Sequence, residues 1–259
     1  MNNINRERFE ETAIIIRQEE IADDIYSMWL RAEDVAVHAK PGQFVSVYCN
    51  DGSRLLPRPI SICEIDRHDG AIRLVYRVAG KGTDEFSFLH TGQQLRIVGP
   101  LGNGFPQKSK KAFLIGGGIG IPPMLELAKQ LDCEKQIVLG YRDELFLLDE
   151  FREQGKVYLA TEDGSAGTEG NVLDAIRENG LTADIIYACG PKPMLRALKS
   201  YAAEQGIECW ISMEERMACG IGACLACVCR SKERDAHTNV KNKRVCKEGP
   251  VFRAEEVEV

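Results

Sequence analysis

The chain has 259 residues, and its 33 Lys and Arg against 39 Asp and Glu give a formal net charge of −6. Its hydrophobic content of 44% and charged content of 28% are ordinary for globular domains and exclude a largely disordered, collagen-like or coiled-coil chain. The negative balance argues against nonspecific nucleic-acid binding, which depends on Lys and Arg. The sequence has no apolar run near the roughly 18 residues of a membrane-spanning helix and no signal peptide, so we expect a cytoplasmic protein without membrane contact.

Residues 1–108 alternate short β-rich runs with turns, which is typical of a small antiparallel barrel or sandwich. Turn dipeptides such as Pro41-Gly42 and Gly99-Pro100 separate the runs. Of the two architectures we predict the β-barrel for this first domain. We expect one short helix over 84–89, with Thr83 as its N-cap. The expected strands include 13–16, 44–48, 72–78 and 95–98.

In residues 109–212 the spacing of the apolar residues changes, and short apolar strands alternate with amphipathic helices. This alternation predicts an α/β domain with a parallel sheet and crossover helices. The expected strands are 112–115, 137–140, 157–160, 185–188 and 208–212, with helices over 122–131, 144–154, 172–179 and 193–205.

Residues 213–259 form a third, small segment, and five of the ten cysteines lie in the last 41 residues. In a chain without a signal peptide, clustered cysteines favour a metal site over disulfides. The spacing Cys219-x4-Cys224-x2-Cys227, followed after 18 residues by Cys246, matches the plant-type [2Fe–2S] ligand pattern. Small residues between these cysteines let the backbone fold around a cluster. We therefore predict a cluster domain with these four ligands.

Other interpretations of the cysteines stay open at this point. Structural zinc also accepts four thiolates, but zinc ribbons usually present two C-x2-C pairs and this tail has one. Disulfides and inert buried thiols are two further possibilities. Cys229 is a rival fourth ligand, although a C-x-C arrangement with Cys227 is cramped, so we prefer Cys246.

Two glycine-rich turns follow predicted strands of the second domain. Gly116-Gly117-Gly118-Ile119-Gly120-Ile121-Pro122-Pro123 runs from a strand into a helix, which is the arrangement that binds phosphate through backbone N–H groups. It is not a Rossmann G-x-G-x-x-G pattern. A second turn, Cys189-Gly190-Pro191, also follows a strand, and open parallel sheets bind ligands at this end of their strands. Tight packing alone would be the alternative role of both turns.

The order of motifs resembles the ferredoxin reductase superfamily. Arg58-Pro59-Ile60-Ser61 corresponds to its R-x-x-S, Gly82-Thr83 to its G-T, and residues 99–105 to its G-P-x-G-x-F loop. The two glycine turns correspond to its GGGxGxxP and CGP motifs. With the cysteine tail added, the whole chain resembles the electron-transfer subunits of NAD-dependent, type B dihydroorotate dehydrogenases. Ile60 is a departure, because many members carry an aromatic there that stacks on the flavin.

The resemblance implies a role for each matching position. The residues that would bind FAD in the barrel are Arg58, Pro59, Ile60, Ser61, Val75, Tyr76, Arg77, Gly82 and Thr83. The residues that would form the nicotinamide cleft are Gly116, Gly117, Gly118, Gly120, Pro122, Cys189, Gly190 and Pro191. The cluster ligands would be Cys219, Cys224, Cys227 and Cys246.

The resemblance also implies a partner and an electron route. Dihydroorotate would be oxidised at FMN on a separate catalytic subunit, in a heterotetramer with two copies of each chain. Electrons would pass singly through the cluster to FAD and then as hydride to NAD+. We name no catalytic acid or base, because the protein would contribute placement and redox tuning of its cofactors and not acid–base chemistry. The four histidines (His38, His68, His90 and His237) fall in no motif.

NAD is expected over NADP, because Asp143 and Glu144 would oppose a 2′-phosphate, whereas Arg142 could accept one. Two alternatives remain for the function. One is the same flavin and cluster module in a hydrogenase, sulfite reductase or transhydrogenase-like complex. The other is a zinc-tail interaction module on a nucleotide-binding scaffold.

Overall fold

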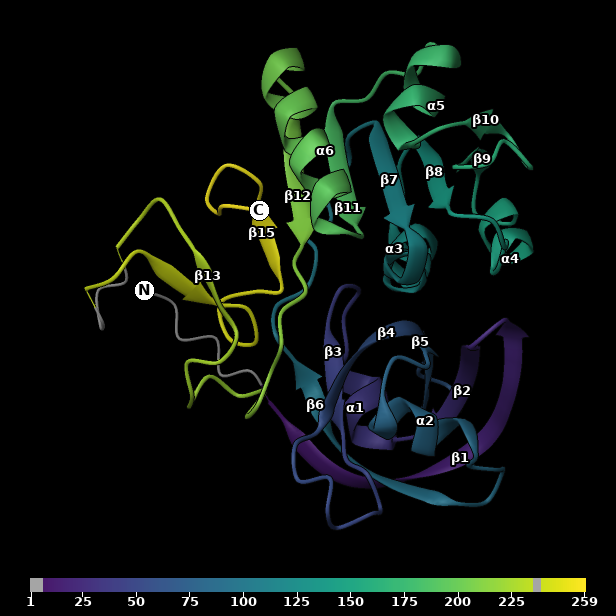
Figure 1. Cartoon of the computed structure of the whole chain (residues 1–259), viewed down its shortest axis with the longest axis vertical. Helices are drawn as coiled ribbons and strands as arrows, with labels where there is room; N and C mark the ends of the chain where they lie inside the picture. The colour runs from purple at the N-terminus through teal and green to yellow at the C-terminus, as the bar shows by residue number, and fades with distance from the viewer. Residues whose placement is uncertain (1–6, 235–238) are drawn as a thin grey trace.

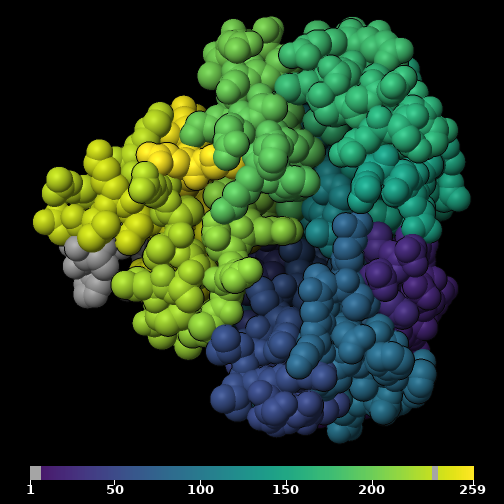
Figure 2. All heavy atoms as spheres, in the orientation of Figure 1, coloured from purple at the N-terminus to yellow at the C-terminus, as the bar shows by residue number. Residues whose placement is uncertain are grey.

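The computed structural model describes residues 7–234 and 239–259, which fold into a barrel, a mixed sheet with helices, and a C-terminal tail beside both (Figure 1). Figure 2 shows the same three masses packed into one body. Within the described part of the chain, no helix is long and apolar enough to cross a membrane. The predicted combination of barrel, α/β sheet and small tail is confirmed, while the boundaries predicted after residues 108 and 212 stay predictions.

The barrel is closed and antiparallel, with strand order β1-β2-β5-β4-β3-β6. It closes because the long strand β1 pairs with β2 along one half and with β6 along the other. Buried aliphatic side chains from all six strands fill its interior. The strands are β1 (Phe9–Ala22), β2 (Ile25–Arg31), β3 (Phe44–Val47), β4 (Arg58–Asp66), β5 (Ala71–Arg77) and β6 (Gln94–Leu101), and the helices are α1 (Glu33–His38) and α2 (Lys81–Ser87).

The short helix of the barrel begins earlier than expected. Helix α2 starts at Lys81 with Gly80 as its N-cap, so the prediction of Thr83 as the cap is wrong. Thr83 lies inside the first turn, and its hydroxyl oxygen accepts hydrogen bonds from the backbone N–H groups of Ala79 (2.9 Å) and Gly80 (3.3 Å). This backward contact orders the turn before the helix, a role that a capping side chain otherwise fills.

The second sheet has seven strands in the order β10-β9-β8-β7-β11-β12-β15, parallel except for β15, which runs antiparallel to β12. Helices α5 and α6 cover one face and α3 and α4 the other, and each face has its own apolar core. The strands are β7 (Ala112–Gly117), β8 (Lys135–Tyr141), β9 (Lys156–Thr161), β10 (Thr168–Glu169), β11 (Ile185–Cys189), β12 (Glu208–Ser212) and β15 (Val251–Arg253). The helices are η1 (Gly118–Gly120), α3 (Pro122–Gln130), α4 (Leu148–Arg152), α5 (Val172–Glu178) and α6 (Lys192–Gln205).

The helix predicted over 144–154 is wrong in its first half, because α4 covers only Leu148–Arg152. The Tyr141 hydroxyl donates a hydrogen bond to the Phe146 carbonyl (2.8 Å), which folds the preceding segment back onto the sheet. Phe146 and Leu147 are buried there, and Leu147 has a left-handed φ of 58°. Burial of these two side chains therefore overrides the helical pattern of the surrounding acids.

The C-terminal tail contacts both larger units. It contains a short antiparallel hairpin of β13 (Val228–Arg230) and β14 (Asn242–Arg244). The chain then returns to the second sheet as β15, on the edge of β12. On the barrel side, the Asn103 side-chain amide donates a hydrogen bond to the Val251 carbonyl (2.7 Å) and its carbonyl oxygen accepts one from the Val251 N–H (2.9 Å). The tail is therefore fixed beside the junction of barrel and sheet.

Candidate functional site

Most of the residues predicted to bind FAD in the barrel line one cavity of about 530 Å³ between the barrel and the second sheet. We call this cavity the interdomain pocket. The first residues of β4 and the last residues of β5 meet there because the two strands are antiparallel neighbours. Helix α2 follows β5 and adds Thr83. The predicted residues that line the pocket are Arg58, Pro59, Ile60, Ser61, Val75, Tyr76, Arg77 and Thr83.

Gly82 does not line the interdomain pocket but lies beneath it. A Cβ atom added at Gly82 would overlap the Nε, Cζ and Cδ atoms of Arg58, so the arginine packs directly over the glycine. Arg58 also donates a hydrogen bond to the Leu56 carbonyl. Because Gly82 has no side chain, the Arg58 guanidinium fits against the first turn of α2. A positive charge beside the start of a helix suits the binding of a phosphate group.

The opposite wall of the interdomain pocket comes from a segment that sequence reasoning missed. Residues 212–217, which connect β12 to the first cluster cysteine, line the pocket together with Ile119 and Pro250. Desolvation by the surrounding protein raises the pKa of Glu214, whereas Glu215 forms an ion pair with Lys192 (2.5 Å). Residues 213–218 belong to the stretch that runs into the cysteine motif and carries the family resemblance, but the sequence pattern alone indicates no role for them in a pocket. Arginine, hydroxyl and apolar groups around one cavity fit a phosphate-bearing cofactor with a flat ring.

The sheet-edge pocket is a second cavity, of about 540 Å³, at the carboxyl ends of the parallel strands. Gly117, Gly118 and Pro191 of the predicted nicotinamide cleft line it. Arg77 lines both this cavity and the interdomain pocket, so the two cavities adjoin. Acidic side chains also line it, namely Asp23, Asp24, Asp143, Glu144 and Glu162. Asp23, Asp24 and Glu162 were not predicted, because no motif surrounds them.

The remaining predicted cleft residues hold the two glycine turns together underneath the sheet-edge pocket. A Cβ at Gly120 would lie 2.5 Å from the backbone of Cys189 and Gly190, so the turns cross at backbone contact. A Cβ at Gly116 would lie 2.9 Å from Cα of Ile121. Pro122 begins α3, where proline is tolerated. Burial raises the pKa of the Cys189 thiol, which is 1% exposed.

The four predicted cluster cysteines gather as two pairs. The sulfurs of Cys219 and Cys224 are 3.3 Å apart, and the Cys246 N–H donates a hydrogen bond to the Cys227 sulfur (3.5 Å). Among the described residues, no three His, Cys, Asp or Glu side chains converge on a single metal-ion position. Four thiols in two neighbouring pairs suit an iron–sulfur cluster, which is held by four cysteines.

Electrostatics separate the cluster cysteines from Cys229. Against desolvation, hydrogen bonds from the backbone N–H groups of Cys224, Ile221 and Ala223 lower the pKa of Cys219 to about 6. A thiolate is the form that binds metal. Burial and the neighbouring Cys227 and Cys219 raise the pKa of Cys246 to about 12.

Cys229 has different neighbours. Burial and Glu215 raise the pKa of its thiol, while Lys243 on β14 opposes that rise. Cys229 lies on β13 opposite Lys243 of β14 and takes part in neither of the two cysteine pairs.

The histidines take no part in these sites in the described residues. His38 forms an ion pair with Glu7 (2.8 Å), His68 contacts Asp69 (2.7 Å), and His90 is exposed. The prediction for His237 lies outside the described residues.

Comparison with known families adds two matches to this geometry. Residues 12–105 match the model of the oxidoreductase FAD-binding domain. Residues 214–258 match the model of the iron-sulfur cluster binding domain of dihydroorotate dehydrogenase B. A Fusobacterium nucleatum protein named "Dihydroorotate dehydrogenase B (NAD(+)), electron transfer subunit" is 44% identical over 93% of this chain and 95% of its own length. The chain belongs to the electron transfer subunits of dihydroorotate dehydrogenase B.

Further relatives of this subunit agree. A protein of the same name from a Geobacillus species is 45% identical over 96% of this chain and 98% of its own length. A solved structure described as an NADH-dependent reduced ferredoxin-NADP oxidoreductase superposes with a TM-score of 0.86 at 31% identity, covering 96% of this chain and 90% of that one. The cytochrome P450 reductase GcoB of Amycolatopsis, at 24% identity and a TM-score of 0.64 over 76% of this chain and 67% of its own, shares the fold.

The family assignment settles two of the questions left open by the sequence. The barrel of this subunit is an FAD-binding domain, and its tail is an iron–sulfur domain that includes all four predicted cysteines. The zinc interpretation of the tail is therefore not supported.

Proposed function

We propose that this subunit holds FAD in the interdomain pocket, NAD at the sheet-edge pocket, and a [2Fe–2S] cluster on Cys219, Cys224, Cys227 and Cys246. It works with an FMN-containing dihydroorotate dehydrogenase catalytic subunit in a cytoplasmic heterotetramer of two copies of each chain. The partner oxidises dihydroorotate in pyrimidine biosynthesis, and this subunit delivers the electrons to NAD+.

One observation carries the proposal, namely that the three sites are contiguous. Arg77 lines both pockets, so a ligand of the sheet-edge pocket meets one of the interdomain pocket. Residues 213–217 line the interdomain pocket and lead within two residues to Cys219. The interdomain pocket therefore lies between the other two sites, where a carrier that serves both is required.

Each group of residues has a distinct task in this arrangement. A bound flavin supplies both hydride exchange with nicotinamide and single-electron exchange with an iron–sulfur cluster. Arg58 provides a fixed positive charge, and Thr83 a hydroxyl, for phosphate at the start of α2. The backbone N–H groups of Ala223 and Cys224 donate to the Cys219 sulfur (3.3 Å each) and stabilise its thiolate form.

The acids of the sheet-edge pocket support NAD as the nucleotide. Asp143 and Glu162 line the cavity and repel an added 2′-phosphate. Glu144 has a second role, because its carboxylate accepts a hydrogen bond from the Asp23 N–H (2.9 Å) and so bridges sheet and barrel. Asp143 accepts a hydrogen bond from the Glu144 N–H (2.8 Å) and lies 4.0 Å from the guanidinium of Arg142, which also lines the cavity, so its carboxylate offsets a nearby positive charge that could accept a 2′-phosphate.

A sister complex is the second candidate, favoured by the match to the NADH-dependent reduced ferredoxin-NADP oxidoreductase at 31% identity. The dihydroorotate assignment has the stronger support, because whole-length relatives with that name reach 45% identity.

The test is NAD+ reduction by dihydroorotate in the complex purified without oxygen. We expect turnover that is lost when this subunit is removed from the catalytic subunit and returns when it is added back. A preparation with flavin and iron that oxidises NADH, yet gives no turnover with dihydroorotate, would favour the sister complex. Mass measurement of the intact complex checks the stoichiometry.

A further inference from the structure

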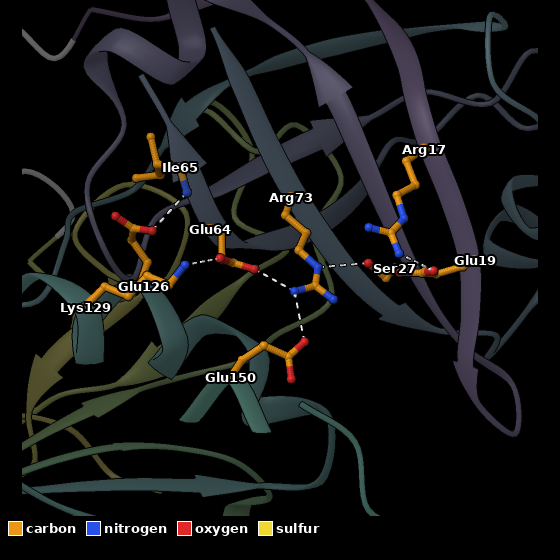
Figure 3. Close-up of polar contacts among 9 residues, drawn as sticks. All are labelled: Arg17, Glu19, Ser27, Glu64, Ile65, Arg73, Glu126, Lys129 and Glu150. Carbon is orange, nitrogen blue, oxygen red and sulfur yellow. Dashed lines mark hydrogen bonds and ion pairs between the residues drawn. The ribbon is translucent and has the colours of Figure 1, made fainter. Parts of the chain in front are cut away.

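A group of charged side chains lies between the barrel and the second sheet, away from both pockets (Figure 3). On the barrel side, Arg73 of β5 forms an ion pair with Glu64 of β4 (2.6 Å). The Arg73 side chain is 8% exposed and the Glu64 side chain 9% exposed. Arg73 also donates a hydrogen bond to the Ser27 hydroxyl on β2 (2.8 Å). These contacts fix the position of the Glu64 carboxylate within the barrel wall.

The same charges are bonded across the domain junction. Lys129 of α3 forms an ion pair with the other oxygen of Glu64. Glu150 of α4 lies 3.4 Å from the Arg73 guanidinium. Glu126 of α3, 4% exposed, accepts a hydrogen bond from the Ile65 backbone N–H on β4 (2.9 Å). Figure 3 shows the helix side chains reaching the barrel strands. We call Glu64, Arg73, Glu126, Lys129 and Glu150 the interdomain latch.

The latch joins two elements that each lead to one cofactor site. Strand β4 begins with residues 58–61, which line the interdomain pocket, and continues to Glu64 and Ile65. Helix α3 begins at Pro122, directly after the glycine turn of the sheet-edge pocket, and continues to Glu126 and Lys129. A shift of α3 along β4 would therefore change the separation of the two cofactor sites.

Physical principles argue that such a device is needed. Interfaces between domains of one chain allow relative motion unless specific contacts fix them. A buried ion pair adds little net stability compared with apolar packing, but it specifies one alignment, because a shifted alignment leaves charges unpaired. Hydride transfer requires the reacting atoms at about 3–3.5 Å, and a misplacement of about 1 Å can lower the rate about 100-fold.

We propose that the interdomain latch sets the distance between nicotinamide and flavin, so that its members are positioning residues for hydride transfer. This inference rests on the proposed function. NADH loses a hydride to become NAD+, and the flavin gains that hydride and one proton from solvent. The latch residues line neither pocket and act through β4 and α3.

The test variant is Lys129→Met in the full chain with its cofactors, because it removes the ion pair between α3 and Glu64 and leaves Glu64 paired with Arg73. Flavin reduction is followed by rapid mixing with NADH without oxygen. We expect the limiting rate at saturating NADH to fall about 10- to 100-fold. The Kd for NADH should change less than about twofold, because the nucleotide contacts remain. Lys129→Arg should restore the rate.

A second measurement does not depend on turnover. Hydrogen exchange should become faster at the Ile65 amide and at residues 116–121 in Lys129→Met, with the rest of the barrel unchanged. The matched control is Glu19→Gln, which breaks the exposed Arg17–Glu19 pair of β1 (2.7 Å), drawn in the same view, and should alter neither rate nor exchange (Figure 3). Glu126→Ala, which removes the bond to Ile65, is the second variant if Lys129→Met folds poorly.

Three outcomes decide the inference. A normal reduction rate with normal exchange in Lys129→Met overturns it. A rate loss that accompanies loss of flavin, or faster exchange throughout the barrel, also overturns it, because the role would then be structural. Failure of NADH to reduce the flavin of the unmodified chain contradicts the proposed function instead, and exchange at Ile65 and residues 116–121 then decides whether the latch aligns the domains.

Discussion

The guanidinium group of Arg58 packs directly onto Gly82, at the point that any larger side chain on α2 would occupy. Arg58 is the first residue of β4, and Gly82 lies in the first turn of α2. The contact therefore joins two elements that are separated in the sequence. It also holds the positive charge at the mouth of the interdomain pocket. The glycine therefore matters for where the arginine lies.

Gly82→Ala is expected to weaken FAD binding by about tenfold or more while the chain still folds. The clashing atoms belong to a flexible side chain, so Arg58 moves instead of the backbone, and its charge leaves the phosphate position. Alanine in a helix is about 1 kcal/mol more favourable than glycine, so thermal stability should not fall. Flavin titration of the cofactor-free chain measures the effect. Gly52→Ala is the control, because a Cβ there meets nothing within 4 Å; equal affinity in both variants would remove the role assigned to the Arg58 contact.

The cysteine pairing predicts different results for two neighbouring thiols. Cys246→Ser should lose the cluster, because it replaces a thiolate ligand at a position whose backbone N–H contacts the Cys227 sulfur. Cys229→Ser should keep it, because Cys229 lies near Lys243 and Glu215. Iron and acid-labile sulfide per chain, with electron paramagnetic resonance of the reduced protein, measure both. The ligand assignment is wrong if Cys229→Ser is the variant that loses iron.

Local signals predicted most of the fold. The parallel strands around β7 and the helices α3, α5 and α6 follow the expected pattern, because each buries a regular apolar face. The helix over 144–154 was predicted to start too early, because the burial of Phe146 and Leu147 depends on contacts with distant residues that a local sequence pattern does not contain. Strand β15 was missed for the same reason, since its pairing with β12 spans a large sequence separation.

The site divides in the same way. Residues within motifs, such as Arg58 and the cluster cysteines, are recognisable because backbone geometry or metal chemistry restricts the residue type. The latch pair of Glu64 and Lys129 has no motif around it and cannot be told from surface charges in the sequence. Glu214 lies in the stretch that leads to Cys219, but the sequence does not indicate that it lines a pocket. Only the packing of α3 on β4, and of the tail against the barrel, gives them a specific position.

Nucleotide preference should depend on Asp143 more than on Glu144. Asp143→Ala removes a negative charge from the sheet-edge pocket and should improve NADPH binding about tenfold, equivalent to about 1.4 kcal/mol. Glu144→Ala should also loosen the bridge to Asp23 and weaken both nucleotides alike. Titration of each variant with NADH and NADPH separates the two effects. Unchanged selectivity in Asp143→Ala would show that the discriminating charge lies elsewhere.

Low pH should weaken the ion pairs between Glu208 of β12 and the two lysines Lys108 and Lys110, which lie in the segment between β6 and β7. Against desolvation, hydrogen bonds from Lys108, Trp210 and Lys110 lower the pKa of Glu208 from its usual 4.5 to about 2. Because the folded-state pKa is the lower one, the stabilisation is complete above pH 4.5 and is lost as the pH falls through about 2.

Glu208→Gln tests this pH dependence. The variant should be less stable than the unmodified chain by about 1 kcal/mol at pH 7, the size expected of an ion pair near the surface. The difference should shrink below pH 4.5 and vanish only below about pH 2, as urea unfolding at a series of pH values would measure. Glu134→Gln, which breaks the more exposed pair with Lys111 (2.9 Å), is the control and should show no such trend. A stability difference between the Glu208→Gln variant and the unmodified chain that stays constant from pH 7 to pH 2 would contradict this account. It would mean that the stabilisation does not come from the negative charge of Glu208 beside Lys108 and Lys110.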